Sequence, residues 1–376
     1  MNYRTGIYFC AAMMGTVPAF AQQSQGSVTL YGLIDQGLER ASGTSGPEYR
    51  VASGTAASRW GVRGNEDLGG GWNAVFTLES GIAVDTGASG QGGRLFGRQA
   101  FVGLKGDFGT VTVGRQLTMR FFGMMDADLF GAGAHGTGVL DSGIPNARAD
   151  NSISYMGKWG GFSGGLNYSF GRDASPAAAT TSAAATNCPG ETSSAKQCRE
   201  WSLMVKYDAG SWGVVGAYER QHGGTPALAA TATFAAVPAT FGGLTSPDKK
   251  DARLTVNAYM KIDKNQIGVG VLRRNNEGSA TPKSGLYWLA AQVPVPSTAL
   301  VIDGMVSHIK FDNSSNKAAM LNLRASYWLS RRTNLYVSTA YIRNGGNLAL
   351  AASSNIPVPR AGGSQSSVIM GIKHTF

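Results

Sequence analysis

Apolar and polar side chains alternate along much of the chain, most clearly in residues 366–376. Val368, Met370 and Ile372 share one parity with the final aromatic residue, Phe376, whereas the positions between them are polar or small, except Ile369. A strand directs alternate side chains to opposite faces, so this pattern predicts a strand with one apolar face. Because an unpaired strand of this kind invites aggregation, we predict that its apolar face meets lipid and that the strand closes a barrel.

The same alternation recurs along the chain, in stretches of about ten residues separated by tight turns and longer polar links. Glycine, asparagine and aspartate supply the positive φ angles of the turns, as in 67–71 and 263–265. We predict sixteen strands, at 28–39, 58–66, 72–82, 97–106, 109–116, 151–158, 161–170, 200–208, 211–221, 250–262, 265–275, 284–293, 299–310, 318–329, 333–343 and 366–376. An even number permits antiparallel closure, so the predicted fold is an all-β, sixteen-stranded antiparallel transmembrane β-barrel with short periplasmic turns and long extracellular loops.

Aromatic residues concentrate near the predicted strand ends, as expected of the interfacial girdles of a membrane barrel. The alternative is the core of a soluble β-sandwich, which would expose many sheet edges. The residues concerned are Trp72, Phe108, Trp159, Phe162, Trp212, Tyr287, Trp288, Tyr327, Trp328 and Phe376.

Composition agrees with a barrel and argues against nucleic-acid binding. Charged residues make up 15% of the chain, against about 25% in soluble domains. The formal charge is +10, but the basic residues are spread singly and not in runs. Past its first residues the chain has no apolar stretch long enough for a transmembrane helix, and a barrel dilutes its apolar residues one in two.

The first 21 residues are typical of a secretory signal. Arg4 precedes a short apolar stretch, and Ala19 and Ala21 flank Phe20 in a small-x-small cleavage site. The alternative, a retained anchor, is disfavoured by the length of the apolar stretch. We therefore expect a cleaved segment, 1–21, and a single barrel domain, 22–376.

Two cysteines remain in that domain, Cys188 and Cys198, and an exported pair ten positions apart most simply forms a disulfide. The alternative is a pair of free thiols. No histidine lies near them, and neither a nucleophile elbow nor a zinc-protease motif occurs. We expect no catalytic residues, no metal and no cofactor.

The link 117–150 is both apolar and acidic, which is unusual for an exposed loop. Phe121, Phe122 and Phe130 accompany Asp126 and Asp128 among many glycines. A loop of over thirty residues with no secondary structure of its own is uncommon in solvent, and its apolar residues favour burial. We expect it to fold into the barrel and form a constriction with an acidic side.

Basic residues gather on the first strands, and we expect them to face this loop across the pore. They are Arg59, Arg63, Arg98, Lys105, Arg115 and, just past the link, Arg148. Clustered arginines favour anions through the Coulomb interaction. The alternative is that each arginine pairs with a carboxylate such as Glu79 to stabilise the fold. Arg98 shares the parity of apolar residues, so either the alternation breaks at that strand end or its side chain reaches back from the rim.

Five ordered motifs of this chain resemble the trimeric general porins of Gram-negative bacteria, and the anion-preferring porins of beta-proteobacteria in particular. They are VTLYGLID at 28–35, SRWGVRG at 58–64 with EDLG at 66–69, GRQAFVGL at 97–104, VGR at 113–115 and NSISY at 151–155, and the terminal GIKHTF at 371–376 resembles the closing strand. The resemblance is dense over 28–170 and returns at 318–376.

The resemblance implies a homotrimer of pores, each with its third loop folded inside. It places Arg59, Arg98 and Arg148 at the constriction and gives Arg115 a less defined part. It makes Phe376 a signal for the barrel assembly machinery, and it implies contact with outer-membrane lipid and lipopolysaccharide. The expected function is passive diffusion of small hydrophilic solutes and ions with mild anion preference. The alternatives are a specific channel for phosphate or organic acids and, from another class, a barrel hydrolase or adhesin.

Overall fold

The structure is a computed structural model of the 376-residue chain. It describes residues 26–43, 46–141, 147–173, 188, 190–224, 233–234, 237–238, 244–279, 281 and 283–376. The predicted signal segment lies outside the described residues.

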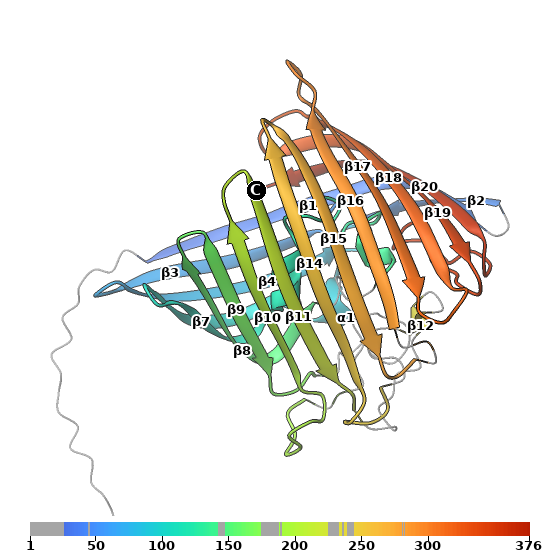
Figure 1. The fold of residues 1–376 in the computed structure, drawn as a ribbon. Coiled ribbons are helices and arrows are strands. Elements are labelled where there is room, and N and C mark those ends of the chain that lie inside the picture. The colour runs from blue at the N-terminus through green and yellow to red at the C-terminus, as the bar shows by residue number, and fades with distance from the viewer. Residues whose placement is uncertain are drawn as a thin grey trace, which may run out of the picture.

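One antiparallel sheet closes on itself into a tilted barrel (Figure 1). Within the described residues its wall has sixteen strands, which confirms the predicted fold. They are β1 (Ser27–Gly43), β3 (Arg59–Gly69), β4 (Trp72–Ala83), β6 (Gln99–Gly106), β7 (Gly109–Leu117), β8 (Arg148–Trp159), β9 (Phe162–Ser169), β10 (Glu200–Asp208), β11 (Trp212–His222), β14 (Lys250–Ile262), β15 (Asn265–Asn276), β16 (Lys283–Pro294), β17 (Leu300–Phe311), β18 (Lys317–Trp328), β19 (Thr333–Gly345) and β20 (Ser364–Thr375).

The last strand closes the barrel against the first, as the alternation in 366–376 predicts. β20 pairs with β1 from Leu33↔Thr375 to Ala41↔Ser367. The N–H of Phe376 donates to the Gly32 carbonyl at 3.0 Å, and the Gly32 N–H donates to the Phe376 carbonyl at 3.1 Å. The polar groups at the chain end are therefore used in the ladder, and no free edge remains there.

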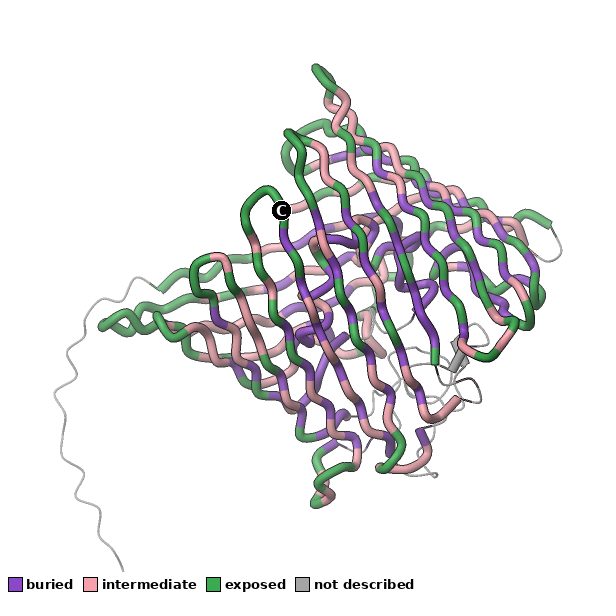
Figure 2. The backbone as a smooth tube through the Cα atoms, viewed as in Figure 1, coloured by how far each residue is buried: buried purple, intermediate pink, exposed green. Residues whose placement is uncertain are grey.

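Side chains alternate between an apolar outer face and a polar or loop-covered inner face. In β18, Leu321 and Leu323 are exposed outside, whereas Met320 and Asn322 are buried inside. Figure 2 shows the same alternation along the strands at the front of the barrel. Exposed aliphatic side chains on one face only are what a lipid-facing wall requires.

The connections separate into short turns at one end of the barrel and long loops at the other (Figure 1). Turn residues with positive φ include Gly210 at 86° and Asp263 at 55°, conformations that glycine and aspartate tolerate. We call these ends the short-turn end and the long-loop end.

Aromatic rings surround the short-turn end on the outside. Trp72 and Phe108 have ring centroids 4.9 Å apart, and Phe162 and Tyr207 are 4.8 Å apart. Trp288 is an exception and the prediction for it is wrong: it is 3% exposed and points into the barrel. Its parity in β16 places it inside, because the exposed neighbours Tyr287 and Leu289 point outward.

Several short elements were not predicted. β2 (Gly46–Ala52) pairs with the extended end of β1, so that β1 runs beyond the predicted end at 39. The loops also hold α1 (Gly90–Gly93), α2 (Met119–Met124), the 3-10 turn η1 (Thr137–Val139) and the two-residue strands β5 (Ala88–Ser89), β12 (Thr233–Phe234) and β13 (Val237–Pro238). Among the described residues, no helix is long and apolar enough to cross a membrane.

Candidate functional site

The long link between β7 and β8 lies inside the barrel. We call residues 118–147 the internal loop, of which the structure describes 118–141 and 147. Its helix α2 contacts the inner faces of β9, β10, β11 and β14. The N–H of Met119 donates to Ser202 Oγ at 2.9 Å, and Asn257 Nδ2 donates to the Gly123 carbonyl at 2.6 Å. The loop is thus hydrogen-bonded to the wall along its course.

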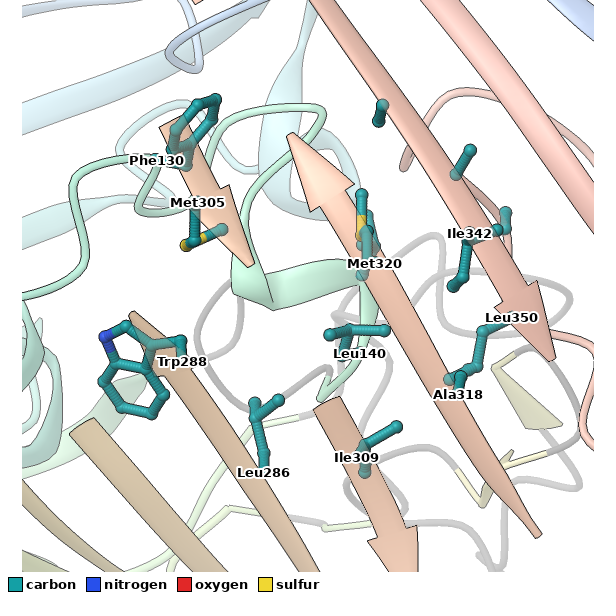
Figure 3. Close-up of a cluster of buried hydrophobic side chains, with 14 of the residues drawn as sticks. Phe130, Leu140, Leu286, Trp288, Met305, Ile309, Ala318, Met320, Ile342 and Leu350 are labelled. Carbon is teal, nitrogen blue, oxygen red and sulfur yellow. The ribbon is translucent and has the colours of Figure 1, made fainter. Parts of the chain in front are cut away.

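An apolar cluster holds the middle of the internal loop against the wall. Met124, Phe130 and Leu140 of the loop are buried among inward side chains of β15 to β19. Figure 3 shows Phe130 and Leu140 beside Trp288, Met305 and Met320. Burying side chains of this size stabilises a contact by about 1.5–3 kcal/mol each, so the cluster accounts for the apolar composition of the loop.

Two ion-paired sites anchor the loop where it enters and leaves this cluster. Arg120 Nε lies 3.0 Å from Glu219 Oε1 of β11, and Thr118 Oγ1 donates to Glu219 Oε2 at 2.6 Å. Asp141 Oδ1 lies 3.1 Å from Arg253 Nε of β14. The side chains of Arg120 and Arg253 are 0% exposed, so these charges are fully desolvated and paired.

Neighbouring charges extend these pairs along the inner faces of β10, β11, β14 and β15, which we call the covered wall. Asp251 Oδ2 lies 3.0 Å from Arg253 Nη1 and 2.8 Å from Arg274 Nη2. Arg172 Nε lies 2.8 Å from Glu200 Oε2. In this network four arginines meet four carboxylates: Arg120, Arg172, Arg253 and Arg274 with Asp141, Glu200, Glu219 and Asp251.

The opposite side of the lumen carries the arginines expected from the sequence. Glu79 of β4 lies between two of them: its Oε1 is 2.6 Å from Arg98 Nε, and its Oε2 is 3.7 Å from Arg59 Nε. Tyr31 Oη also donates to Glu79 Oε2, at 3.0 Å. Arg148 is buried and interacts electrostatically with Arg98, Arg59 and Glu79. We call Arg59, Arg98 and Arg148 with Glu79 the arginine wall.

The structure resolves the parity of Arg98. β6 begins at Gln99, so Arg98 precedes the regular alternation, and its N–H donates to the Glu79 carbonyl at 3.1 Å. The alternation therefore breaks at this strand end, the first of the two alternatives. Within the wall, Arg59 is the more accessible: its side chain is 29% exposed, against 9% for Arg98.

Arg63 and Arg115 lie apart from this group. Arg63 is exposed on β3, with its guanidinium 5.2 Å from the centre of the Tyr31 ring. Arg115 lies at a β-bulge between β7 and β8. It ion-pairs with Asp150, and its Nε donates to the Gly97 carbonyl at 2.7 Å. The structure thus brings together three of the five predicted arginines and gives the other two different neighbours.

The two predicted acidic residues of the loop have different surroundings. Asp126 is partly exposed, and its Oδ2 lies 2.8 Å from Lys206 Nζ of β10. Asp128 is 5% exposed and faces the interior of the loop. There it accepts hydrogen bonds from the N–H groups of Phe130 and Gly131, at 3.2 and 2.8 Å, and from Thr137 Oγ1. Burial raises the pKa of the Asp128 carboxyl.

A space remains open between the inner faces of β3, β4 and β6 and the start of the internal loop. It has a volume of about 440 Å³. Arg63, Gln99 and Phe101 line it from these strands, and Met119 and Phe122 line it from the loop. A single cation, Arg63, therefore faces the loop across this space, while the arginine wall lies outside its lining.

Comparisons with known proteins agree with this geometry. A model of the Gram-negative porin family matches residues 10–347. The chain belongs to the Gram-negative porin family. This porin is 30% identical to an outer membrane porin protein of Bordetella pertussis, over 95% of this chain and 96% of that protein. It is 29% identical to outer membrane porin protein 32 of Delftia acidovorans, with the same coverage.

Solved structures show the same architecture. An anion-selective porin from Comamonas acidovorans superposes with a TM-score of 0.74 and 27% identity, over 94% of this chain and all of that one. OmpT of Vibrio cholerae, at 16% identity and a TM-score of 0.65, shares the fold. The chain is thus a porin of the outer membrane, its fold is that of a channel, and its long-loop end is the extracellular end.

The structure of the porin also shows a buried histidine that the sequence did not indicate. His135, in the internal loop, has its Nδ1 2.8 Å from Ser338 Oγ and its Nε2 2.9 Å from Ser367 Oγ. Asn322 Nδ2 donates to its carbonyl. Burial lowers the pKa of His135 to about 4. The one sequence signal for these hydrogen bonds is that Ser338 and Ser367 occupy inward-facing positions of their strands.

The remaining sequence-predicted residues lie outside the lumen site. Cys188 and Cys198 are joined in a disulfide, with their Cα atoms 5.7 Å apart. Phe376 ends the strand that closes the barrel, and its side chain is 43% exposed. Among the described residues, no group of three His, Cys, Asp or Glu side chains is arranged to hold a metal ion.

Proposed function

We propose that this porin lets small hydrophilic solutes and ions diffuse through the outer membrane with a mild preference for anions. The arginine wall carries the proposal: Glu79 ion-pairs with Arg98 and Arg59, and Arg148 interacts electrostatically with all three, so three positive charges and one negative charge meet in this group. An excess of positive charge beside a low-dielectric wall raises the local concentration of anions. Arg63 and Arg115 extend this positive region, and the partly exposed Asp126 supplies its acidic counterpart on the loop.

The test is planar-bilayer recording under a salt gradient. The triple variant Arg59→Gln/Arg98→Gln/Arg148→Gln should move the reversal potential toward cations, because it removes the excess positive charge. The matched control neutralises three exposed cations in turns at the short-turn end, Lys264→Gln/Arg331→Gln/Arg332→Gln. A control that shifts the reversal potential as far as the triple variant would assign selectivity to overall charge and overturn the proposal.

A specific channel for organic acids is the second candidate, and the 440 Å³ space favours it. Arg63, Thr77 and Phe101 occupy one inward row across three neighbouring strands, so a cation and an aromatic ring are separated by roughly 10 Å. An acid with an apolar body fits between them. Current that benzoate blocks at micromolar concentration, and that Phe101→Ala restores, would favour this function over passive diffusion.

The proposal includes the partners of the channel. We infer a homotrimer in the outer membrane, in contact with lipid and lipopolysaccharide, and insertion by the barrel assembly machinery through the strand that ends at Phe376. The exposed Phe376 ring on the apolar parity of β20 supports the last point. Deleting Phe376 should lower the amount of folded trimer in isolated outer membranes, whereas refolding in detergent should change less. Equal loss in both would assign Phe376 to barrel stability instead.

A further inference from the structure

β2 and β3 follow one another along the same side of β1, but the chain leaves the sheet between them. β2 pairs with residues 37–43 of β1, and β3 pairs with residues 27–33. Residues 53–58, between the two strands, turn toward the lumen and form hydrogen bonds with the internal loop. We call them the inward segment. Local departures from a regular strand redirect side chains and are common next to functional sites.

Asp35 of β1 holds the inward segment with a carboxylate that is fully buried. Its Oδ2 accepts hydrogen bonds from the N–H of Thr55 at 2.9 Å, from Thr55 Oγ1 at 2.5 Å and from the N–H of Ala56 at 2.8 Å. Its Oδ1 accepts from Tyr336 Oη of β19 at 2.5 Å, and the Asp35 N–H donates to Ser58 Oγ at 2.9 Å. A carboxylate removed from water requires such donors, so Asp35 fixes the conformation of the segment.

The inward segment contacts both the arginine wall and the internal loop. At its end, the Ala57 carbonyl accepts a hydrogen bond from Arg59 Nη1 at 3.1 Å, which directs a partly exposed side chain of the arginine wall. Near its start, the Gly54 carbonyl accepts from the N–H of Ala134, at the tip of the internal loop, at 2.7 Å. The Ala134 carbonyl in turn accepts from the N–H of Ser354 at 2.9 Å. One short segment is therefore bonded to a candidate selectivity residue and to the loop tip.

The inward segment is also packed tightly against its neighbours. A Cβ atom on Gly54 would overlap Tyr336 Oη, and a Cβ atom on Gly133 would lie 2.6 Å from the Thr55 carbonyl oxygen. Neither position has space for a methyl group. A shift of the inward segment toward the lumen must therefore displace the tip of the internal loop as well.

We propose that Asp35, Thr55 and Tyr336 are positioning residues for the ion selectivity of this porin. Through the inward segment they fix the direction of the Arg59 side chain and the position of the loop tip. Asp35 and Tyr336 are buried, so they act through the segment and do not contact a permeating ion. The inference rests on the proposed function, because it takes the arginine wall as the origin of selectivity. The alternative is a role in barrel stability alone.

The variant Thr55→Val/Tyr336→Phe removes two hydroxyl donors from Asp35 and changes no charge. In planar-bilayer recordings under a salt gradient, Arg59→Gln should shift the reversal potential of the wild type toward cations. The shift should be smaller in the Thr55→Val/Tyr336→Phe background, because the Arg59 side chain is no longer held in a fixed direction there. Residues that act only on stability would leave the two shifts equal, since independent sites give additive effects.

Two controls accompany this comparison. Thr55→Ser keeps the hydroxyl donor and should behave like the wild type. Tyr155→Phe/Thr298→Val makes the same types of change at the short-turn end, where each hydroxyl donates to a backbone carbonyl, at 2.6 and 2.9 Å. This control should leave the shift caused by Arg59→Gln unchanged.

Hydrogen–deuterium exchange of the folded full-length porin in detergent reports on the internal loop without depending on selectivity. The Ala134 N–H should exchange roughly tenfold faster in Thr55→Val/Tyr336→Phe than in the wild type, as expected for the loss of about one hydrogen bond. The Met119 N–H, which donates to Ser202 Oγ near the start of the loop, should keep its wild-type rate. Unequal changes at the two sites distinguish a local shift of the loop tip from general unfolding.

Three results would overturn the proposal. They are equal shifts for Arg59→Gln in the two backgrounds, an unchanged exchange rate at Ala134, and exchange that is faster at Met119 as well as at Ala134. If Arg59→Gln leaves the reversal potential of the wild type unchanged, the arginine wall fails as the origin of selectivity, and exchange at Ala134 still tests whether the inward segment positions the loop. Failure of the inward segment and failure of the proposed function therefore appear in different measurements.

Discussion

Both sides of the lumen are rich in arginine, but the arginines on the two sides have different functions. On the covered wall each arginine meets carboxylates within a network that balances its charge, and Arg120 and Arg253 are fully buried. On the arginine wall Glu79 ion-pairs with Arg98 and Arg59 and interacts electrostatically with Arg148, and the Arg59 side chain remains partly exposed. The number and position of the carboxylates, and not the number of arginines, therefore distinguish a loop anchor from a candidate selectivity element.

We expect the largest loss of stability from Glu219→Gln, which removes one carboxylate from the balanced charges of the covered wall. Arg120 would keep a buried charge with its partner carboxylate removed, which costs about 3–5 kcal/mol. We expect the internal loop to leave the wall, seen as a lower unfolding temperature and as noisy, larger single-channel currents. The double variant Arg120→Met/Glu219→Met removes both charges and should recover most of the stability. A double variant as unstable as Glu219→Gln would contradict the assignment of this pair as a balanced anchor.

A glutamate-to-glutamine substitution on the arginine wall should change mainly the ion selectivity. Glu79→Gln removes the only carboxylate of that group, so the reversal potential should move further toward anions. Its cost in stability should be smaller than that of Glu219→Gln, because Arg59 retains contact with water. Asp107→Asn, in an exposed turn, is the control of equal charge. If Glu79→Gln moved the potential toward cations, the proposed excess of positive charge would be wrong.

Acid should loosen the loop at its tip, because His135 is buried in the neutral form. Its pKa is lowered to about 4 in the folded protein and is about 6.5 when the loop is undocked. The undocked state binds more protons between these values. The stabilisation by neutral His135 is therefore complete above pH 6.5 and declines, by roughly 1 kcal/mol per pH unit, as pH falls toward 4.

Single-channel recordings from pH 7 to pH 4 would test this dependence through the rate of current fluctuations. The variant His135→Gln should flatten it, while His374→Gln, at the exposed short-turn end, should leave it unchanged. A pH dependence that persists in His135→Gln would assign the fluctuations to other groups.

We expect the smallest change in stability and in selectivity from Asp126→Asn, at the edge of the covered wall. Asp126 and Lys206 form a partly exposed pair, of a kind that contributes about 1 kcal/mol or less. Asp126→Asn removes one of two carboxylates near Lys206, whose Nζ is also 3.4 Å from Asp208 Oδ2. The reversal potential should therefore shift slightly toward anions, by less than in Glu79→Gln. The unfolding temperature should stay close to that of the wild type. A loss of stability comparable to Glu219→Gln would place Asp126 among the loop anchors.

Local pattern was sufficient for the wall of the barrel. Alternation in β18 and β20 fixes which side chains meet lipid, because a strand has a period of two and one face must be apolar. Turn residues such as Gly210 and Asp263 mark where strands end, since their conformations are local. Exceptions to alternation were informative as well: Ile369 breaks the polar parity of β20 because it packs on Ala134 of the internal loop.

Alternation and turn residues did not predict the contacts between segments that lie far apart in the sequence. Trp288 was predicted at the membrane interface, but it packs inside because the internal loop supplies it with apolar neighbours more than a hundred residues away. The sequence did not indicate the anchoring roles of Arg120 and Asp141, because their partners lie on β11 and β14. Long-range pairing leaves no periodic signal in the chain.

Membrane-spanning strands, their order and their two faces follow from residue spacing, since backbone hydrogen bonding and the lipid solvent act on every strand alike. The course of the internal loop, and with it the division of arginines between anchors and pore, follows from where carboxylates meet them in space. Burial is the reason: a charge removed from water needs a partner, and only the closed barrel brings Glu219 to Arg120 and leaves Glu79 shared among three arginines.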